Sequence, residues 1–530
     1  MRIIALVACA LLTLTGCTMG SAPAGAPGGH SDPSTVEPTP GADAPEEIVE
    51  VADFREPAAE VVAGMDDEAL AGAVVIGSFD GTDPSAGAAL VADNALAGAI
   101  VMAYNLPENP TPDDVRAVTG AITEASADRE APVFLGVDQE GGPVSRLGTA
   151  ALDMPPLMAF GAADDPALTT AAIQAQGEDL RGLGLTADFA PTADVTIGAR
   201  DAAINVRSAG DDPALVSGTV EAAIRGYSDA GILSSAKHFP GHGALTDDSH
   251  DTLPVSEKSI ADMDERDIAP FRAAVAAGVP MVMMGHIGLP GSEDTPASVD
   301  PDAYAELREV LDYDGVVVTD AMNMGAVPAG PRGAESVEAI HAGADLVLLP
   351  PDAQASVGAL REALDSGDLD RERLVEAAER VVAMQLWQEH ASELAVTVDD
   401  HTARIDALAE AALTVVAGEC TFGEPVEEVA VVSGEQAAIS AFTAQAEENG
   451  LSIEANADTT VALNEGASAD VVYGTRGPWR LAGSRADTVL AGYDDYDAGF
   501  GALARYLTGE TDAGGALPVA VDGLDAPDCR

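Results

Sequence analysis

Basic residues are scarce in this sequence. Only 25 Lys and Arg accompany 89 Asp and Glu in 530 residues, so the formal net charge is −64 and the isoelectric point lies near 4.1. This balance argues strongly against nucleic-acid binding, because neutralising phosphates requires a basic face. The chain is nevertheless 47% hydrophobic with a mean hydropathy of +0.11, which is typical of a globular protein with large buried cores.

Cysteine and long apolar runs are also rare. Four cysteines in 530 residues are too few for a disulfide-stapled scaffold. They include no CxxC pair, so nothing suggests a zinc ribbon or a thioredoxin-like centre. After the first residues, no apolar stretch approaches the roughly 20 residues that a transmembrane helix needs. Cys420 and Cys529 are the two cysteines far from the start of the chain, and a disulfide between them is a hypothesis.

The first 50 residues have the pattern of an export signal and a tether. Met1 and Arg2 precede the apolar run 3–14, which ends in Leu14-Thr-Gly-Cys17 and resembles a bacterial lipobox. We therefore expect a signal peptide over 1–16, lipid modification of Cys17 and an extracytoplasmic, membrane-anchored protein. An ordinary secretory signal with a chance cysteine is the alternative. Residues 17–50 are rich in Ala, Gly, Pro, Ser and acidic side chains, which predicts a disordered tether.

Residues 51–395 alternate short apolar runs with longer amphipathic ones, the pattern of repeated βα units and a parallel sheet. The Ala-rich stretches 113–127, 167–182, 213–229 and 267–277 are expected helices, several of which open with Asp-Asp or Asp-Pro pairs suited to capping. Eight strands are expected, which favours a (β/α)8 TIM-type barrel over a doubly wound open sheet. They are 74–79, 98–104, 133–138, 187–195, 233–239, 280–286, 315–320 and 345–349.

The sequence pattern of the C-terminal part, residues 396–530, predicts a smaller α/β domain. Apolar runs at 429–432, 460–463, 471–473 and 488–491 are expected strands, and 404–416 and 436–449 are expected helices. No second set of catalytic residues stands out there. Trp479 and Arg480 are the residues that could approach a site, although packing is the simpler role for them.

Polar side chains gather where the predicted barrel strands end. Asp138, Lys237 with His238, His286 and Asp320 each close or follow an apolar run. Active sites of TIM-type barrels collect at these carboxyl ends. A carboxylate directly after a buried strand also costs desolvation unless it has partners or a task.

Residues 237–251 hold three histidines and three aspartates, which raises the possibility of a metal site. His238 and His242 have the i, i+4 spacing of a helical zinc pair, but Pro240 and Gly241 between them prevent a helix. We therefore expect no metal and no cofactor. For His242 a structural role, hydrogen bonding within the loop, is favoured.

Four segments together resemble glycoside hydrolase family 3, specifically its β-N-acetylglucosaminidase branch. They are 136–142 (GVDQEGG) with Arg146, 205–208 (NVRS), 237–243 (KHFPGHG) with 248–250 (DSH), and 319–324 (TDAMNM). Their order and their position at predicted strand ends make the resemblance specific over about 55–395. A weaker resemblance at 491–493, 507–509 and 515–519 implies an α/β sandwich as the second domain. The chain departs from the pattern at Pro143, where a basic residue is common, and at Ala209, where an aromatic one is common.

The resemblance implies a catalytic role for three residues. Asp320 is the expected nucleophile, which forms a covalent glycosyl-enzyme with retention of configuration; a helix N-cap is its structural alternative. His250 is the expected general acid and base, oriented by Asp248, because imidazole titrates near neutrality. The Gly-, Asp- and Ser-rich segment 243–254 predicts a mobile loop that swings this dyad over the substrate, with Asp247 and Asp251 in solvent.

The same resemblance implies a pocket for an acetamido sugar. The residues expected to bind substrate are Asp138, Arg146, Arg207, Lys237 and His238. Pairing with surface carboxylates is the alternative for Arg146 and Arg207.

The expected function is that of an exo-acting, retaining β-N-acetylglucosaminidase that removes terminal GlcNAc from peptidoglycan fragments, as a monomer tethered by its lipid. Three alternatives stay open. A phosphorylase would use phosphate in place of water, since a histidine repels that anion less than a carboxylic acid does. A β-glucosidase of the same fold and a non-catalytic wall-binding lipoprotein are the others.

Overall fold

The computed structural model describes residues 51–395, 397, 400–464, 468–524 and 526–530, which belong to one compact unit. The lipobox-like segment, Cys17 and the expected tether lie outside the described residues. In the part of the chain that the structure describes, none of the helices is long and apolar enough to cross a membrane.

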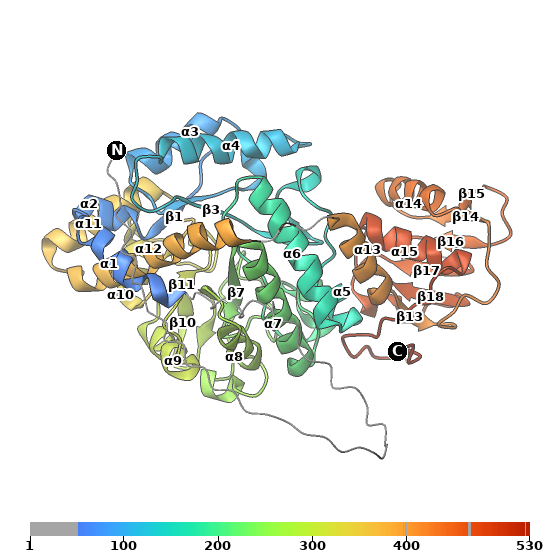
Figure 1. Cartoon of the computed structure of the whole chain (residues 1–530). Coiled ribbons are helices and arrows are strands. Elements are labelled where there is room, and N and C mark those ends of the chain that lie inside the picture. Colours follow the sequence, from blue (N-terminus) through green and yellow to red (C-terminus); the bar gives the residue numbers. More distant parts are fainter. Residues whose placement is uncertain (1–50, 396, 398–399, 465–467, 525) are drawn as a thin grey trace, which may run out of the picture. The chain divides into compact units, whose positions relative to one another are not determined.

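Eight parallel strands form the first sheet, and each falls within one of the eight expected ranges (Figure 1). The sheet runs in the order β11-β8-β7-β6-β3-β2-β1-β12, and a parallel bridge between Val318 and Leu346 joins its two ends. The barrel is therefore closed, and the open doubly wound sheet is excluded. The strands are β1 (Val75–Gly77), β2 (Gly98–Ile100), β3 (Phe134–Val137), β6 (Ala187–Asp188), β7 (Leu233–Phe239), β8 (Met281–Met284), β11 (Val316–Thr319) and β12 (Val347–Leu348).

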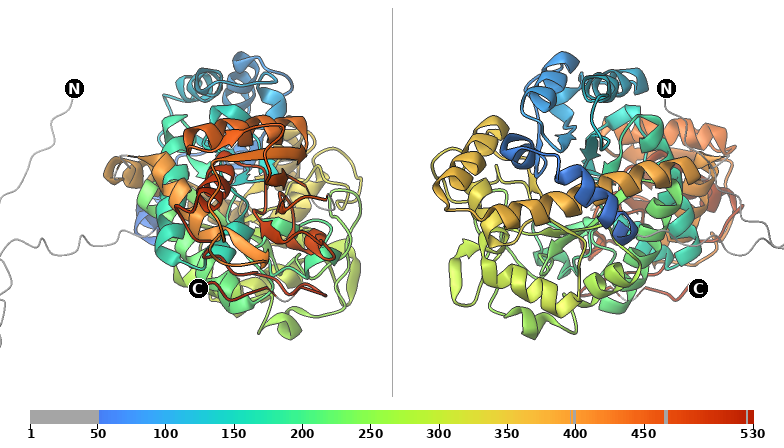
Figure 2. Two further views of the ribbon diagram at one scale, coloured as in Figure 1. Left: turned by 90° about the vertical axis from the view of Figure 1, so that its right-hand side faces the viewer. Right: turned by 60° about the vertical axis from the view of Figure 1, so that its left-hand side comes forward.

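Helices surround this barrel in all views (Figures 1 and 2). Four of them, α3, α6, α7 and α9, begin at an Asp-Pro pair, and α6 and α7 are the helices expected at 167–182 and 213–229. The aspartates accept a hydrogen bond of 2.8–3.0 Å from a backbone N–H of the first turn. The helices are α1 (Arg55–Val62), α2 (Asp67–Gly72), α3 (Pro84–Asp93), α4 (Pro112–Ala125), α5 (Leu157–Ala163), α6 (Pro166–Gly182), α7 (Pro213–Ala230), α8 (Ala269–Ala276), α9 (Pro301–Leu311), α10 (Ala334–Ala342), α11 (Ala353–Ser366) and α12 (Arg371–Leu394).

Short elements decorate the loops at the strand ends. Two hairpins consist of β4 (Gln139–Gly141) with β5 (Val144–Ser145), and β9 (Gly288–Leu289) with β10 (Ser292–Pro296). The 3-10 turns are η1 (Val51–Phe54), η2 (Ala103–Asn105), η3 (Gly148–Ala150), η4 (Gly198–Arg200), η5 (Asn205–Arg207), η6 (Ile260–Met263), η7 (Ala297–Val299) and η8 (Pro478–Leu481).

The strands of the barrel are buried on both faces. Alternate residues such as Phe134, Met283 and Val318 form an inner apolar cluster, whereas Leu135 and Val317 belong to the larger cluster beneath the helices. This period of two follows from the alternation of side chains along a strand. Both faces are therefore apolar, and the strands read as continuous apolar runs in the sequence.

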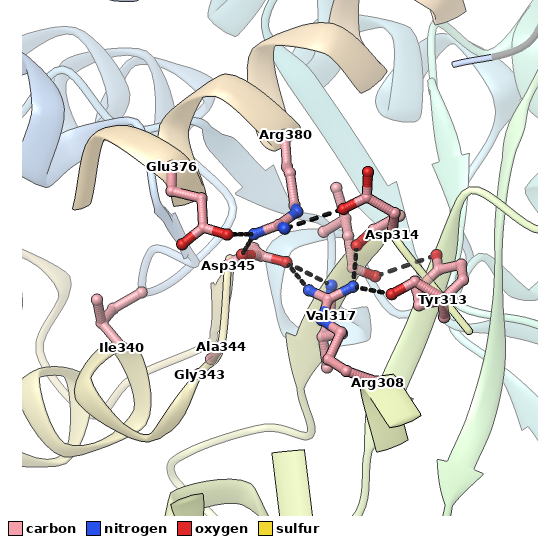
Figure 3. A network of polar contacts seen from close by, with 12 residues as sticks. Arg308, Tyr313, Asp314, Val317, Ile340, Gly343, Ala344, Asp345, Glu376 and Arg380 are labelled. Atoms are coloured by element: carbon pink, nitrogen blue, oxygen red, sulfur yellow. Dashed lines mark hydrogen bonds and ion pairs between the residues drawn. The ribbon is translucent and has the colours of Figure 1, made fainter. Parts of the chain in front are cut away.

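A buried ion-pair network lies at the amino ends of β11 and β12 (Figure 3). Asp345, whose side chain is 0% exposed, accepts a hydrogen bond of 3.0 Å from the backbone N–H of Val317. Its carboxylate also pairs with Arg308 at 2.6 Å, Arg373 at 3.0 Å and Arg380 at 3.2 Å. The network thus links helices α9 and α12 to the seam where the barrel closes.

A second sheet of six strands follows, in the order β13-β18-β17-β16-β14-β15, and all neighbours are parallel except β13 and β18. Its strands are β13 (Thr414–Ala417), β14 (Glu428–Ser433), β15 (Ser452–Ile453), β16 (Thr460–Ala462), β17 (Val471–Gly474) and β18 (Thr488–Ala491), and its helices are α13 (His401–Ala412), α14 (Gln436–Glu448) and α15 (Asp497–Thr508). The expected helix 404–416 is wrong at its end, because 414–417 form β13.

The end of the chain is fixed to this second sheet and to the barrel. Cys420 and Cys529 form the disulfide, with Cα atoms 5.5 Å apart. On the barrel side, the backbone N–H of Asp497 donates to Asp153 at 2.8 Å, and Ala516 donates to the carbonyl of Ala162 at 3.0 Å.

Candidate active site

A cavity of about 260 Å³ opens at the carboxyl ends of the barrel strands. Its wall comes from residues at or just after the ends of β2, β3, β7, β11 and β12 and from the loop after β7. Of the residues expected to act on or bind substrate, all but Asp248 line it. They are Asp138, Arg146, Arg207, Lys237, His238, His250 and Asp320.

Asp320 directly follows β11 and is 8% exposed. Burial raises the pKa of this carboxyl, but the nearby His286 and His238 rings act in the opposite direction. Together with a 2.7 Å hydrogen bond from the N–H of Ala321 and the ammonium of Lys237, they bring the pKa of Asp320 down to about 2. The group is a carboxylate at any physiological pH. No helix begins within the next ten residues, so the helix N-cap role is not observed.

His250 and Asp248 form a hydrogen-bonded pair in the loop after β7. Imidazole Nδ1 lies 2.8 Å from Asp248 Oδ1, which also accepts the backbone N–H of His250 at 2.9 Å. Because Nδ1 is held by the carboxylate, Nε2 is the ring nitrogen left for a ligand. The His250 side chain is 61% exposed and lines the same cavity as Asp320.

The loop that carries this pair is docked onto the segment after β11. The N–H groups of Gly325 and Ala326 donate to the carbonyls of His250 and Ser249 at 3.0 and 3.2 Å. A Cβ on Gly325 would stand 2.7 Å from the His250 carbonyl oxygen, so glycine permits this approach. The dyad is therefore formed in this conformation, which differs from the expectation that it reaches the substrate only by swinging. Asp247 and Asp251 are exposed, as expected.

Glu140 organises the cationic side of the cavity and was missed in the sequence. Its carboxylate, 7% exposed, receives Nη2 and Nε of Arg207, each at 2.8 Å, and Nζ of Lys237 at 2.7 Å. Lys237 Nζ also donates to Asp138 at 2.9 Å. Burial raises the pKa of Glu140, and the two cations lower it far more, so it stays ionised. Arg207 thus pairs with a buried carboxylate of the cavity wall and not with one at the surface.

Arg146 differs from the other two cations. Its backbone N–H donates to Gln139 Oε1 at 3.0 Å, but its guanidinium makes no hydrogen bond or ion pair within the described residues, and its Nε is buried. The guanidinium of Arg146 is therefore free to donate hydrogen bonds to a ligand oxygen.

Asp194 is the second carboxylate that sequence reasoning missed. It is fully buried; its Oδ2 holds Nδ1 of His238 at 2.7 Å, and its Oδ1 accepts the backbone N–H of His242 at 2.6 Å. Burial lowers the pKa of His242 to about 4, so this ring is neutral, and its Nε2 lies 3.1 Å from Ser249 Oγ in the dyad loop. This contact links His242 to the dyad loop, and the ring also lines the cavity. The available signal for Asp194 was its place inside the expected strand 187–195, where a carboxylate needs a partner.

His286 stands behind Asp320 without lining the cavity. Its Nδ1 lies 2.6 Å from Ser298 Oγ and its Nε2 3.0 Å from the carbonyl of Ala321. Burial lowers its pKa. As for metals, the described residues contain no group of three or more His, Cys, Asp or Glu side chains placed to hold an ion.

The chain is similar to a known protein family and to several of its members. The model "Glycosyl hydrolase family 3 N terminal domain" matches residues 72–384. Beta-hexosaminidase LpqI of Mycobacterium tuberculosis is 31% identical over 405 residues, which cover 72% of this chain and 97% of the relative. Beta-hexosaminidase A of Pseudoalteromonas piscicida is 29% identical over 56% of this chain, and the match spans about half, 54%, of that longer protein.

A solved structure covers both sheets. The family 3 β-N-acetylglucosaminidase from Paenibacillus sp. str. FPU-7 superposes with a TM-score of 0.76 and 27% identity, covering 87% of this chain and 100% of its own. The barrel, the second α/β domain and the family match lead to one conclusion. This chain belongs to glycosyl hydrolase family 3 and is a glycoside hydrolase.

Proposed function

We propose that the chain is an exo-acting, retaining β-N-acetylglucosaminidase. The observation that carries this proposal is that an ionised, buried carboxylate, Asp320, and a carboxylate-oriented imidazole, His250, line one small cavity. Hydrolysis of a glycosidic bond needs these two groups, one for the anomeric carbon and one for the leaving oxygen. The relatives named β-hexosaminidase and the structural neighbour named β-N-acetylglucosaminidase support the sugar.

In the first step, a carboxylate oxygen of Asp320 bonds to the anomeric carbon while the bond from that carbon to the leaving oxygen breaks. Nε2 of the His250 imidazolium gives its proton to the leaving oxygen. Asp248 holds Nδ1–H and stabilises the cation before transfer.

In the second step, the now neutral Nε2 takes a proton from water as the water oxygen attacks the anomeric carbon. The bond to Asp320 breaks and the carboxylate returns. Two displacements on the same carbon leave its configuration unchanged.

The cavity suits a single terminal sugar. Its volume of about 260 Å³ is below the roughly 300–1,000 Å³ of pockets for drug-sized ligands, so it favours an exo-acting enzyme over one that binds a long chain. Arg146, Asp138 and His238 offer hydrogen-bonding groups to the sugar hydroxyls and to the acetamido group. Lys237 and Arg207 hold the carboxylates of this wall in place.

We propose peptidoglycan fragments with terminal GlcNAc as the substrate and the outer side of the membrane as the place of action. The lipobox-like segment ending in Cys17 supports the location. The mass of the mature protein purified from membranes tests it: a diacylated N-terminus is expected at Cys17, and an unmodified chain that is fully released to the medium would contradict anchoring.

The activity is tested with 4-nitrophenyl N-acetyl-β-glucosaminide and the matching β-glucoside, using soluble protein that starts after Cys17. We expect release of 4-nitrophenol from the acetamido substrate only, with the β-anomer of GlcNAc appearing first by NMR. Asp320→Ala should reduce kcat by at least about 10³-fold, since it removes the attacking group. Asp251→Ala, an exposed neighbour outside the cavity, is the matched control.

Two outcomes would overturn parts of this proposal. Full activity of Asp320→Ala would remove Asp320 from the mechanism, and turnover of the glucoside alone would make the enzyme a β-glucosidase. Adding phosphate separates hydrolysis from phosphorolysis, because a phosphorylase would yield the sugar 1-phosphate.

A further inference from the structure

A second cavity of about 580 Å³ adjoins the first. The two share four wall residues, Val144, Ala203, Ile204 and Arg207. Beyond this shared wall, the second cavity runs between the barrel loops and the second sheet. The proposed mechanism uses the first cavity for the terminal sugar, so the second lies where the rest of a substrate would continue.

The wall from the second sheet has the topology of a ligand site. Its residues follow the carboxyl ends of parallel strands: Glu435 after β14, Asn464 after β16, Arg476 after β17 and Tyr493 after β18. Strands β15 and β16 lie on opposite sides of β14, so the chain reverses direction across the sheet there. Ligands of open α/β sheets bind at such switch points, outside the carboxyl ends.

Two arginines give this wall its chemistry. Arg480, in η8, is exposed, and its side chain makes no hydrogen bond or ion pair within the described residues. Arg476 pairs with Glu435 at 3.0 Å, an exposed contact of the kind that contributes little and is easily exchanged. In a molecule with a net charge of −64, an arginine without a carboxylate partner at a cavity wall is available to an anion from outside.

The carboxyls in the same wall oppose an anion less than their number suggests. Burial, with Asp495 and Asp153 close by, raises the pKa of Asp494, which favours its neutral form. Glu435 and Asp495 are exposed, so water and salt screen their charge. The first turn of α14 adds backbone N–H groups at the cavity edge, since Glu435 at its start makes no side-chain cap.

We propose that the second cavity is the subsite for the leaving group, and that Arg480, assisted by Arg476, binds a carboxylate on that group. The inference rests on the proposed function and makes its substrate specific: the leaving sugar is an acidic saccharide, such as an amino sugar that carries a lactyl ether or a peptide. Bidentate pairing of guanidinium with carboxylate selects it over a neutral sugar.

The test compares three substrates in the same enzyme. GlcNAc-β-1,4-MurNAc carries the carboxylate, diacetylchitobiose is its neutral counterpart, and 4-nitrophenyl N-acetyl-β-glucosaminide has no sugar in the second cavity. We expect Arg480→Ala to lower kcat/KM about tenfold for the acidic disaccharide and less than twofold for the other two. Arg480→Lys should recover part of the loss, and Arg476→Ala should show a smaller loss in the same direction.

Arg485→Ala is the matched control, because Arg485 is an exposed arginine of the same loop that does not line the cavity. It should leave all three substrates unchanged. An equal effect of Arg480→Ala on both disaccharides, or no effect on either, would overturn the subsite. In that case activity on the 4-nitrophenyl substrate would still support the proposed function, whereas a wild-type enzyme inactive on all three substrates would refute both.

Discussion

At the scale of single residues, the two proposed catalytic groups differ in what fixes their charge. Asp320 is buried and kept ionised by the residues around it, with a pKa of about 2. His250 is exposed and touches one carboxylate, that of Asp248. We therefore expect the nucleophile to be ready over the whole working pH range, and the pH dependence to come from the imidazole.

This difference predicts the pH profile. The imidazole must be protonated for the first step, so kcat/KM should fall as the pH rises. On the acid side, Asp320 has a pKa of about 2 and stays ionised down to pH 4, so its protonation produces no loss between pH 4 and neutrality. In His250→Ala the fall of kcat/KM at higher pH should vanish. In the same variant, kcat for GlcNAc-β-1,4-MurNAc should fall about 10²- to 10⁴-fold, as measured by product release between pH 4 and 9.

The leaving group supplies an internal control for this prediction. Nitrophenolate departs without a proton, so the first step with the 4-nitrophenyl substrate should slow much less in His250→Ala than with the disaccharide. Azide, a nucleophile that needs no general base, should restore the second step. Equal losses of rate on both substrates, or a fall of kcat/KM at higher pH that persists in the variant, would show that another group transfers the proton.

The residues that line the cavity were predictable from sequence, and the carboxylates that support them were not. Asp320 and Lys237 lie in short motifs at strand ends, and His250 lies in a motif of the loop after β7. The order of residues within each motif is enough to identify them. Glu140 and Asp194 are 2 among 89 acidic residues, and what distinguishes them is a partner remote in sequence. Such pairings depend on the closed barrel and leave no local pattern.

At the scale of elements, helices α9 and α12 meet the closing seam of the barrel through Asp345 (Figure 3). Three guanidinium groups converge on this one buried carboxylate, which also accepts the N–H of Val317 at the start of β11. The network lies at the amino ends of the strands, away from the proposed catalytic residues at the carboxyl ends. It therefore serves stability and not chemistry.

Asp345→Ala should lower the free energy of unfolding by roughly 3–5 kcal/mol, because it leaves Arg308 without its carboxylate partner and removes the buried counter-charge that Arg373 and Arg380 share. Asp314→Ala is the matched control: this carboxylate pairs with Arg55 and Arg380 but is 77% exposed, and its loss should cost about 1 kcal/mol or less. Urea unfolding measures both. A comparable loss in the two variants, or a changed kcat in folded Asp345→Ala, would contradict the structural role.

The sequence predicted the strands and helices where the pattern that identifies them is local. The eight barrel strands lie within their expected ranges, although β6 ends at Asp188 and its expected range ran to 195, and the helices expected at 167–182 and 213–229 start at their Asp-Pro pairs. The segment 414–417 was not predicted as a strand: the Ala-rich helix before it runs into Thr414 and Val415 with no proline or glycine to end it. Pairing with β18, through Thr414 opposite Ala491 and Val415 opposite Leu490, makes this segment a strand. Thr and Val are themselves strand formers, so the local sequence of Thr414, Val415 and Val416 favours the strand that this pairing produces.

At the scale of the whole molecule, the second sheet forms a wall of the cavity that adjoins the candidate active site, without supplying either proposed catalytic group. Its carboxyl edge forms one wall of the larger cavity, and residues of both parts line it. The sequence indicated the second domain and singled out Arg480, but no pattern could say that these loops face the barrel. That juxtaposition depends on contacts such as Asp497 with Asp153.

The net charge of −64 predicts how the folded molecule responds to salt. Carboxylates in such excess repel one another, and this repulsion is strongest in the compact state. Raising NaCl from about 0.01 to 1 M shortens the Debye length from roughly 30 to 3 Å. We expect the Tm at pH 7 to rise by on the order of 5 °C over this range, as followed by differential scanning fluorimetry.

The same titration at pH 4.5, close to the isoelectric point of about 4.1, separates screening from general salt effects. With most of the net charge removed there is little repulsion left to screen, so the salt-dependent gain in Tm should nearly disappear. A gain of equal size at both pH values would mean that salt acts through exclusion from the surface and not through charge. A Tm that falls with salt at pH 7 would mean instead that attractive pairs, such as the arginines around Asp345, outweigh the excess of like charge.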